Sequence, residues 1–576
     1  MNLAYLRNRQ TIRWLGPVII ALSFSILTFW GASRAQPQNV TGIYPAQLAK
    51  MRGLLIISGI WFAVLSVAIL SGRFFSSTHD GEVTPSPAHP VRQRTGIVLL
   101  VVLIVGYIVA YGWLSIARHQ RFNSTGFDLA IKEQVIWNTA HGRFFASSPE
   151  VDNAFADHFQ PLMLALLPFY ILAPSPEVLL WIQTIGLSLG AWPLYRLARR
   201  RLNSTGVALA LTAAYLAFPT LGFINRFDFH PEALAITAFL FAFEALDRND
   251  LTATSVWLLV PLLAKENLGF SVALFGLYAA VVCRHKRFGL LWTVAGIAVS
   301  SLTMFWLIPT LRRGPSDTLS RYGWLGESPT TILRTLLTHP GYVWQQLAEP
   351  NRVLYLLQLL APTGFLALLA LPEVLLAAPG LAINLLADHH CQPQIYCQYG
   401  VPIVPFVFIA AVIGLQKLKA LLRNKWSWTI LGLAIVPLTL IALMLDNPFT
   451  ESQMVPAPLR QLSNAAAVYR ALDVVPPDAS VVTTNAYAPH LARRQGLYII
   501  GIPAQREPPV DPDVVFINLY DQRFMLCDQY REYFAQLDLD RYGTLFRDSG
   551  LIVIQRDGGS NAGFRDFMLN WTNCAG

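Results

Sequence analysis

The stretch FNSTGFDLAIKEQVIWNTAHGRFF, residues 122–145, governs the interpretation of the chain because it crowds polar groups just beyond a long apolar run at 96–117. Its ionisable side chains, spaced over a few helical turns, are Asp128, Lys132, Glu133, His141 and Arg143. Ionisable groups beside a membrane are costly, so a site, a pathway or an internal ion pair is the default explanation for them. The stretch predicts a polar site where the chain leaves the membrane.

The whole chain is too apolar for an ordinary soluble enzyme. Of its 576 residues, 54% are hydrophobic and only 13% are charged, whereas soluble domains average roughly a quarter charged. The net charge of +9 comes from short basic clusters between apolar runs, a pattern of membrane orientation rather than of nucleic-acid binding. The sequence contains no Gly-rich phosphate loop, zinc-finger spacing or basic–aromatic repeat. Composition therefore predicts an integral membrane protein.

Apolar runs predict an α-helical polytopic protein with about thirteen crossings. A crossing helix needs about 20 residues, so several of these runs are short. The run 161–174 is short and bounded by prolines, and it is predicted to be re-entrant or interfacial. The predicted crossings are 15–33, 53–72, 96–117, 176–195, 204–222, 233–246, 252–264, 268–283, 288–309, 353–371, 374–387, 401–415 and 427–445.

Basic residues set the predicted orientation, because cytoplasmic loops are enriched in Lys and Arg. The Arg-rich N-terminus, RLARRR at 196–201 and RHKR at 284–287 all fall on one side when the crossings alternate. The N-terminus is therefore predicted to be cytoplasmic and the loop 118–175 to lie outside. The first run also fits a signal peptide ending at SRA before Gln36, but an uncleaved anchor is favoured.

Three regions follow from this pattern. Residues 1–95 hold two helices and a cytoplasmic linker, and residues 96–445 hold the main transmembrane domain with its outer loop. Residues 446–576 are more polar, with Pro clusters and short β-branched runs such as SVVTTN and DVVFINL. They predict an extracytoplasmic α/β domain.

Four of the five cysteines are predicted to lie outside, which suits an oxidising compartment. The pairs Cys391–Cys397 and Cys527–Cys574 are hypotheses, and four free or buried thiols are the alternative, since spacing does not give connectivity.

Polar groups from distant loops are predicted to converge on the outer side. Arg can bind a phosphate bidentately, a carboxylate can act as a general base, and carboxylates with His can hold a divalent cation such as Mg or Mn. The candidate substrate-binding residues are Arg143, Arg226, Lys265, Glu266, Arg312, Arg313 and Tyr399. The candidate cation ligands are Asp157, His158, His230 and Glu232.

Structural roles are open for the same residues. Asp128 also fits a helix cap, and Asp157–His158 also fits an ordinary loop pair. Glu232 follows Pro231, where a helix N-terminus would favour its charge. Lys265–Glu266 also fits an internal ion pair.

The motifs FDLAIKEQVIWNTAHGRFF, DHFQPLMLALLPFYILAPSP, PLYRLARRRL, NRFDFHPEALAI and LLAKENLG together resemble the membrane-protein family called domain of unknown function 2079, over about 96–555. That family is similar to the GT-C glycosyltransferases. The resemblance implies a GT-C-like bundle in a bacterial plasma (inner) membrane, a lipid-linked sugar donor carried on polyprenyl phosphate, and an acid in the first outer loop as catalytic base. Asp128 matches that acid by position, and Arg312 or Arg313 would hold the phosphate. FDLA lacks the paired acid of some GT-C members.

Two other classes of function remain open. A transporter or flippase for a lipid-linked or small polar solute would carry charged residues in mid-span and internal repeats of the spans. A non-catalytic membrane scaffold would leave the outer acids, His and Arg scattered.

Overall fold

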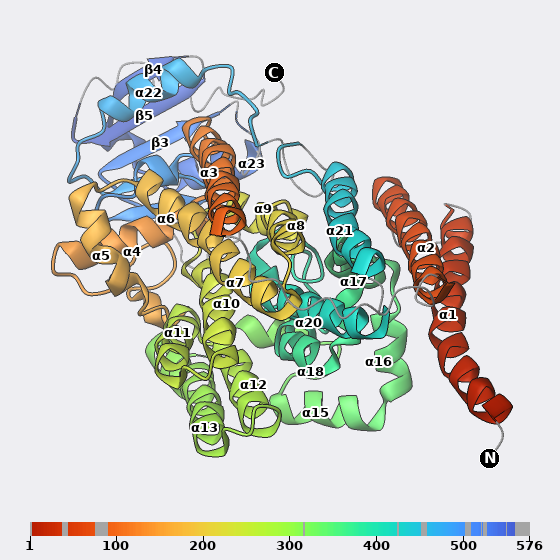
Figure 1. The fold of residues 1–576 in the computed structure, drawn as a ribbon. Helices are drawn as coiled ribbons and strands as arrows, with labels where there is room; N and C mark the ends of the chain where they lie inside the picture. Colours follow the sequence, from red (N-terminus) through yellow and green to blue (C-terminus); the bar gives the residue numbers. More distant parts are fainter. Residues whose placement is uncertain are drawn as a thin grey trace.

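The structure is a computed structural model that describes residues 3–36, 44–74, 90–314, 317–422, 425–450, 458–501, 509–519, 521, 527–548 and 550–558. It consists of a large assembly of apolar helices and a small α/β domain near the C-terminus (Figure 1). The chain is thus a multi-helix membrane protein with a C-terminal α/β domain, as the sequence predicts.

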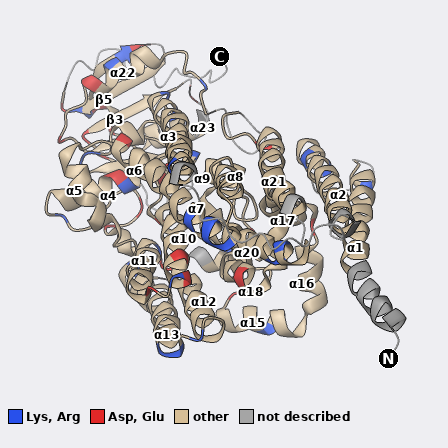
Figure 2. Ribbon diagram, viewed as in Figure 1, with Lys and Arg blue, Asp and Glu red and all other residues tan. Residues whose placement is uncertain are grey.

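Seven segments in the described part of the chain are long and apolar enough to cross a membrane, and a bent pair, Thr205–Leu216 with Pro219–Arg226 at 42°, makes an eighth. The helices that supply the seven are α1 (Leu3–Arg34), α2 (Pro45–Phe74), α3 (Pro90–Gln120), α6 (Pro176–Leu189) with α7 (Ala191–Leu202), α13 (Lys286–Leu302) with α14 (Ile308–Arg312), α20 (Val404–Leu422) and α21 (Lys425–Leu445). Figure 2 shows charged residues mostly at helix ends and in loops, as a hydrocarbon environment requires.

Shorter helices complete the bundle and its loops. They are α4 (Ile131–Ala140), α5 (Met163–Leu172), α8 (Thr205–Leu216), α9 (Pro219–Arg226), α10 (Leu234–Asp247), α11 (Leu251–Ala264), α12 (Leu268–Val281), α15 (Pro329–Thr338), α16 (Pro340–Leu347), α17 (Pro350–Leu360), α18 (Leu371–Val374) and α19 (Ala378–Leu385). The run expected to be re-entrant or interfacial at 161–174 forms α5, which has only ten residues.

The expectation of one helix over 353–371 is wrong. Helix α17 ends at Leu360, and the chain then turns through Gly364 and Phe365, whose φ values are +60° and +54°. Pro362 lacks a backbone donor, and a left-handed residue cannot continue a right-handed helix. The expected helix over 374–387 is also divided, between α18 and α19. Apolar composition predicted burial here but not helix continuity.

The α/β domain is built on a five-stranded sheet of order β2-β1-β3-β5-β4. Strands β1, β2 and β3 are parallel, whereas β5 is antiparallel to both β3 and β4. Helices α22 (Ala465–Asp473) and α23 (Cys527–Ala535) pack on opposite faces. The strands are β1 (Val481–Thr484), β2 (Leu497–Ile500), β3 (Val514–Asn518), β4 (Tyr542–Asp548) and β5 (Leu551–Arg556).

The α22 face of this sheet shares its hydrophobic core with the outer loop. Phe122 and Ala130 are fully buried in the same cluster as Val481 and Phe516, with Phe127 packed against it. The ring of Phe122 lies 4.5 Å from that of His490, between centroids. The domain is therefore docked on residues 118–175 by an apolar contact and is not merely tethered by the chain.

Phe122→Ala is expected to weaken this docking. Removing a fully buried Phe costs about 3–5 kcal/mol, so thermal unfolding shifts downward and limited proteolysis releases the α/β domain faster. The control is Phe144→Ala in the same loop, where the side chain is 57% exposed. Equal protease sensitivity of the two variants would contradict the shared core.

Candidate functional site

Asp128 lies in a short π-helical turn, Gly126–Ala130, at the start of the outer loop's first helix. Its Oδ1 lies 3.0 Å from Nε2 of His230, and its Oδ2 accepts a hydrogen bond of 3.0 Å from the Thr125 hydroxyl. Because a carboxylate only accepts, His230 must carry its proton on Nε2 in this pair. The Asp128 side chain keeps 25% exposure. A fixed carboxylate thus remains reachable from outside.

The pKa of Asp128 is lowered although burial alone would raise it. The charge of His230, hydrogen bonds from His230 and Thr125, and the charge of Lys132 together outweigh the cost of burial. Asp128 is therefore ionised at neutral pH. An ionised, oriented carboxylate can accept a proton from a hydroxyl.

A second acid, Asp228, fixes the turn before Asp128. Its Oδ2 accepts from the backbone N–H of Thr125 at 2.8 Å, and at 2.7 Å it shares the single proton of the Thr125 hydroxyl with Asp128. Arg118 contacts its other oxygen. Asp228 itself is held with φ +51°, an uncommon conformation for a residue other than Gly. Asp228 is not among the candidate residues that the sequence predicts, and its hydrogen bonds anchor the turn that carries Asp128.

Glu232 and Lys265 form a buried ion pair behind this turn. Lys265 Nζ lies 2.7 Å from Glu232 Oε1, and Gln160 donates to Oε2 at 3.0 Å. Burial would raise the pKa of Glu232, but Lys265 and His230 lower it to about 2. The pair matches the internal-ion-pair alternative, with Glu232 rather than Glu266 as the closest acid to Lys265.

Glu266 instead holds the segment that ends the outer loop. Its Oε1 lies 3.0 Å from Nδ1 of His158, and its Oε2 accepts from the backbone N–H of Phe159 at 3.1 Å. Asp157 lies 3.5 Å from the other His158 nitrogen and 3.6 Å from Arg312. Residues from three distant parts of the chain thus meet at one place, as predicted.

Two groups in this cluster were not predicted to act there. Burial, the charge of Asp157 and a hydrogen bond to it raise the pKa of Glu150 to about 8, so the two carboxyls share a proton at neutral pH. Lys132 is 7% exposed, and its charge acts on Asp128, Asp157 and Glu232. The spacing of Asp128 and Lys132, four residues apart on a helix, was the available signal for Lys132. No local pattern marks Glu150.

Other candidate residues lie apart from this cluster or at its edge. Arg143 donates to Asn138 and stacks on Trp137, within its own helix end. Arg226 is buried and donates to the carbonyls of Pro448 and Thr450, where the chain leaves α21. Arg313 is exposed at the end of α14, with φ +58°. Tyr399 contacts Arg321 at 3.0 Å.

The four candidate cation ligands do not fit one metal ion. His230 is engaged by Asp128, Glu232 by Lys265, and Asp157 with His158 by each other and by Arg312. Within the described residues, no group of three or more His, Cys, Asp or Glu side chains is placed to bind a metal ion. We therefore derive no step through a divalent cation.

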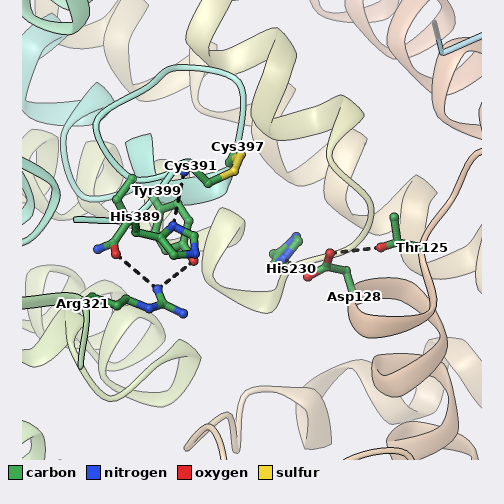
Figure 3. The surroundings of a disulfide bond; sticks show 9 residues. Thr125, Asp128, His230, Arg321, His389, Cys391, Cys397 and Tyr399 are labelled. Carbon is green, nitrogen blue, oxygen red and sulfur yellow. Dashed lines mark hydrogen bonds and ion pairs between the residues drawn. A yellow bond between two sulfur atoms is a disulfide. The ribbon is translucent and has the colours of Figure 1, made fainter. Parts of the chain in front are cut away.

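The pair Cys391–Cys397 is a disulfide with a Cα–Cα distance of 5.9 Å, and Cys283 is a free thiol (Figure 3). The other proposed pair, Cys527–Cys574, lies outside the residues whose side chains the structure describes.

A model of the family described as "Predicted membrane protein (DUF2079)" matches residues 118–553, which include the whole cluster. Among solved structures, the chain is similar to ArnT from Cupriavidus metallidurans bound to undecaprenyl phosphate, at 13% identity and a TM-score of 0.46 over 80% of this chain and 99% of that chain. The apo state of the same protein gives 14% identity and a TM-score of 0.45 over 82% and 99%. No curated protein matches the chain.

The Glu150–Asp157 pair predicts a loss of stability as pH rises from about 4.5 to about 8. The pKa of Glu150 is higher in the folded protein than in the unfolded chain, so the folded state binds more protons and its stability falls as pH rises through about 8. Glu150→Gln keeps the hydrogen-bonding group without the charge. The fall in melting temperature between pH 6.5 and pH 9 should be smaller in Glu150→Gln than in wild type. An identical fall would contradict the shared proton.

The disulfide can be checked by mass spectrometry of the native protein after thiol alkylation and proteolysis. A linked peptide containing Cys391 and Cys397 is expected, with Cys283 alkylated without reduction. Alkylation of Cys391 in the unreduced protein would contradict the structure.

Proposed function

We propose that this chain, which belongs to the DUF2079 family of predicted membrane proteins, is a membrane glycosyltransferase of the GT-C type. A sugar passes from a polyprenyl-phosphate donor to a hydroxyl acceptor at the outer face of a bacterial plasma membrane, with inversion at the anomeric carbon. The observation that carries the proposal is the Asp128 carboxylate, oriented through both oxygens and still exposed.

Asp128 is the best suited of the acids in the cluster. Glu232 is tied to Lys265 and is almost fully buried, and Glu266 holds His158 and the backbone of Phe159. Glu150 is protonated at neutral pH because its pKa is raised to about 8. Asp128 combines a lowered pKa and a 25% exposed side chain with partners, His230 and Thr125, that orient it without a Lys or Arg ion pair at contact distance. The pKa of Glu266 is also lowered, but its side chain is only 9% exposed.

The reaction balances with these groups. Asp128 takes the proton of the acceptor hydroxyl as its oxygen bonds to the anomeric carbon, and the bond from that carbon to the phosphate oxygen breaks. Polyprenyl phosphate leaves with the negative charge. Among the described residues, the Lys132 ammonium has no carboxylate within 4 Å, although its field reaches several acids. It is therefore available to stabilise the phosphate that forms.

The position of the cluster supports a lipid-borne donor. Asp128 follows the end of α3, and Lys265 and Glu266 join the apolar helices α11 and α12. Groups at the ends of apolar helices lie at the depth of lipid headgroups, where the phosphate of a polyprenyl lipid is held.

Asp128→Asn is expected to lower transfer at least about 100-fold, because the amide cannot accept the proton. The measurement is release of free polyprenyl phosphate from polyprenyl-phosphate-linked sugars by the purified full chain in liposomes, read by mass spectrometry. Release does not require the acceptor to be identified if cell-envelope extract supplies it.

The matched control is Asp473→Asn, an exposed acid at the end of α22. It should release polyprenyl phosphate at the wild-type rate, and both variants should keep the wild-type melting temperature within a few degrees. Normal release by a folded Asp128→Asn protein would reject Asp128 as the base.

A further inference from the structure

A second cluster of polar side chains lies around the disulfide, across from Asp128 and His230 in Figure 3. Its members come from the short helix Asp317–Tyr322 and from the loop between α19 and α20. Arg321 Nη1 donates to the Tyr399 hydroxyl at 3.0 Å and to Gln392 Oε1 at 3.3 Å. The guanidinium carbon lies 5.9 Å from the centroid of the Tyr399 ring.

Arg321 differs from several other Arg side chains of the described residues in having no acid at ion-pair distance. In the described part of the chain, no carboxylate lies within 4 Å of its guanidinium, whereas Arg118 and Arg312 each have an Asp partner. Buried Arg494 also has no acid within 4 Å among the described residues, but backbone carbonyls receive its donors. Arg321 is half-buried and both of its contacts use Nη1. Its remaining donors, in the planar fork that suits an oxyanion, make no hydrogen bond to any residue that the structure describes.

The neighbouring His389 presents another donor. The backbone N–H of Cys391 donates to His389 Nδ1 at 3.2 Å, so Nδ1 is an acceptor and the neutral ring carries its proton on Nε2. Burial, Arg321 and His390 lower the pKa of His389 to about 4, which keeps the ring neutral at pH 7. The disulfide at Cys391 fixes the backbone that sets this tautomer. The His390 ring lies against that of His389 in a tilted arrangement, with 4.5 Å between ring centroids.

We propose that Arg321 and His389, held by Tyr399, Gln392 and the Cys391–Cys397 disulfide, form a binding site for a phosphate group. The guanidinium supplies charge and a forked pair of donors, and the His389 Nε2–H supplies a third donor. The site is preorganised, because neutral partners fix Arg321 without competing for the anion.

The surroundings of the site favour a phosphate carried by a lipid. It lies where α20 begins and α19 ends, at the boundary between apolar helices and loops. The adjoining helix α15 has no buried residue, and Leu333, Leu337 and Trp344 in α15 and α16 are 58%, 72% and 70% exposed. Trp324 joins this apolar surface to the site by donating to the Leu386 carbonyl at 2.8 Å. An amphipathic surface of this kind lies in the membrane interface.

The site is linked to the cluster around Asp128. Tyr399, which holds Arg321, contributes to the electrostatic environment of Lys265, which in turn pairs with Glu232. The phosphate site adds to the proposed function. Its assignment to the phosphate of the sugar donor rests on that proposed function. Phosphate binding itself does not require transfer, so the two ideas can fail separately.

The test is binding of dodecyl phosphate and of inorganic phosphate to the purified full chain in dodecyl maltoside, read from the rise in melting temperature with ligand concentration. Wild type should bind dodecyl phosphate, and Arg321→Gln should bind it at least about tenfold more weakly, as expected for loss of a charge-assisted hydrogen bond. Tighter binding of dodecyl phosphate than of inorganic phosphate assigns the site to a lipid. Equal binding assigns it to a free phosphate.

The matched control is Arg334→Gln, an exposed Arg of α15, which should bind as wild type does. Arg321→Lys is the control for a loss of binding caused by misfolding. It keeps the charge but not the forked donors, so it should bind the phosphate with intermediate affinity. Wild-type affinity in Arg321→Gln would overturn the site. Loss of binding in Arg321→Gln, together with no polyprenyl-phosphate release by wild type, would keep the site and reject the transferase.

Discussion

The structure depends on one constraint, that a charge taken out of water beside the hydrocarbon needs a partner. Removing a carboxylate or an ammonium ion from water costs several kcal/mol unless an opposite charge or a set of donors replaces the water. The cluster around Asp128 meets this requirement by short, separate pairings, such as Lys265 with Glu232 and His158 with Glu266. Each pairing joins segments far apart in the chain. The ion pairs therefore hold the loops together at the same time as they form the site.

The α/β domain takes part in this arrangement and is not an independent appendage. Asn485 accepts hydrogen bonds from the backbone N–H groups of Gly126 and Phe127, at 2.7 and 3.2 Å, directly before Asp128. A Cβ on Gly126 would lie 2.6 Å from the end of the Ile499 side chain and 2.9 Å from the Cβ of Ala488, which cannot move away without its backbone, so this close approach favours glycine. Ser148 bonds to both backbone groups of Leu497. The domain thus helps to set the position of the turn that carries Asp128.

Sequence patterns predicted what depends on local composition. Apolar runs located the bundle and β-branched runs located the sheet. Of the two disulfide hypotheses, Cys391–Cys397 is confirmed by the structure, although spacing alone had left free thiols open. Patterns did not predict which charges would pair, because pairing is decided by tertiary geometry. The sequence pattern predicted that Arg226 binds substrate, whereas in the structure it donates hydrogen bonds to backbone carbonyls just after α21. Glu150 and Arg321 gave no local signal, since burial beside Asp157 or Tyr399 is not encoded in neighbouring residues.

The environments of the acids also explain how one cluster can keep several carboxyls in different protonation states. Glu232 faces Lys265 and stays ionised, whereas Glu150 faces Asp157 and retains a proton, although both are removed from water. Burial acts in the same direction on each, so the sign of the neighbouring charge decides the outcome. Asp128 is ionised, as Glu232 is, because His230, Thr125 and Lys132 lower its pKa. The residues around Asp128 therefore decide its protonation state.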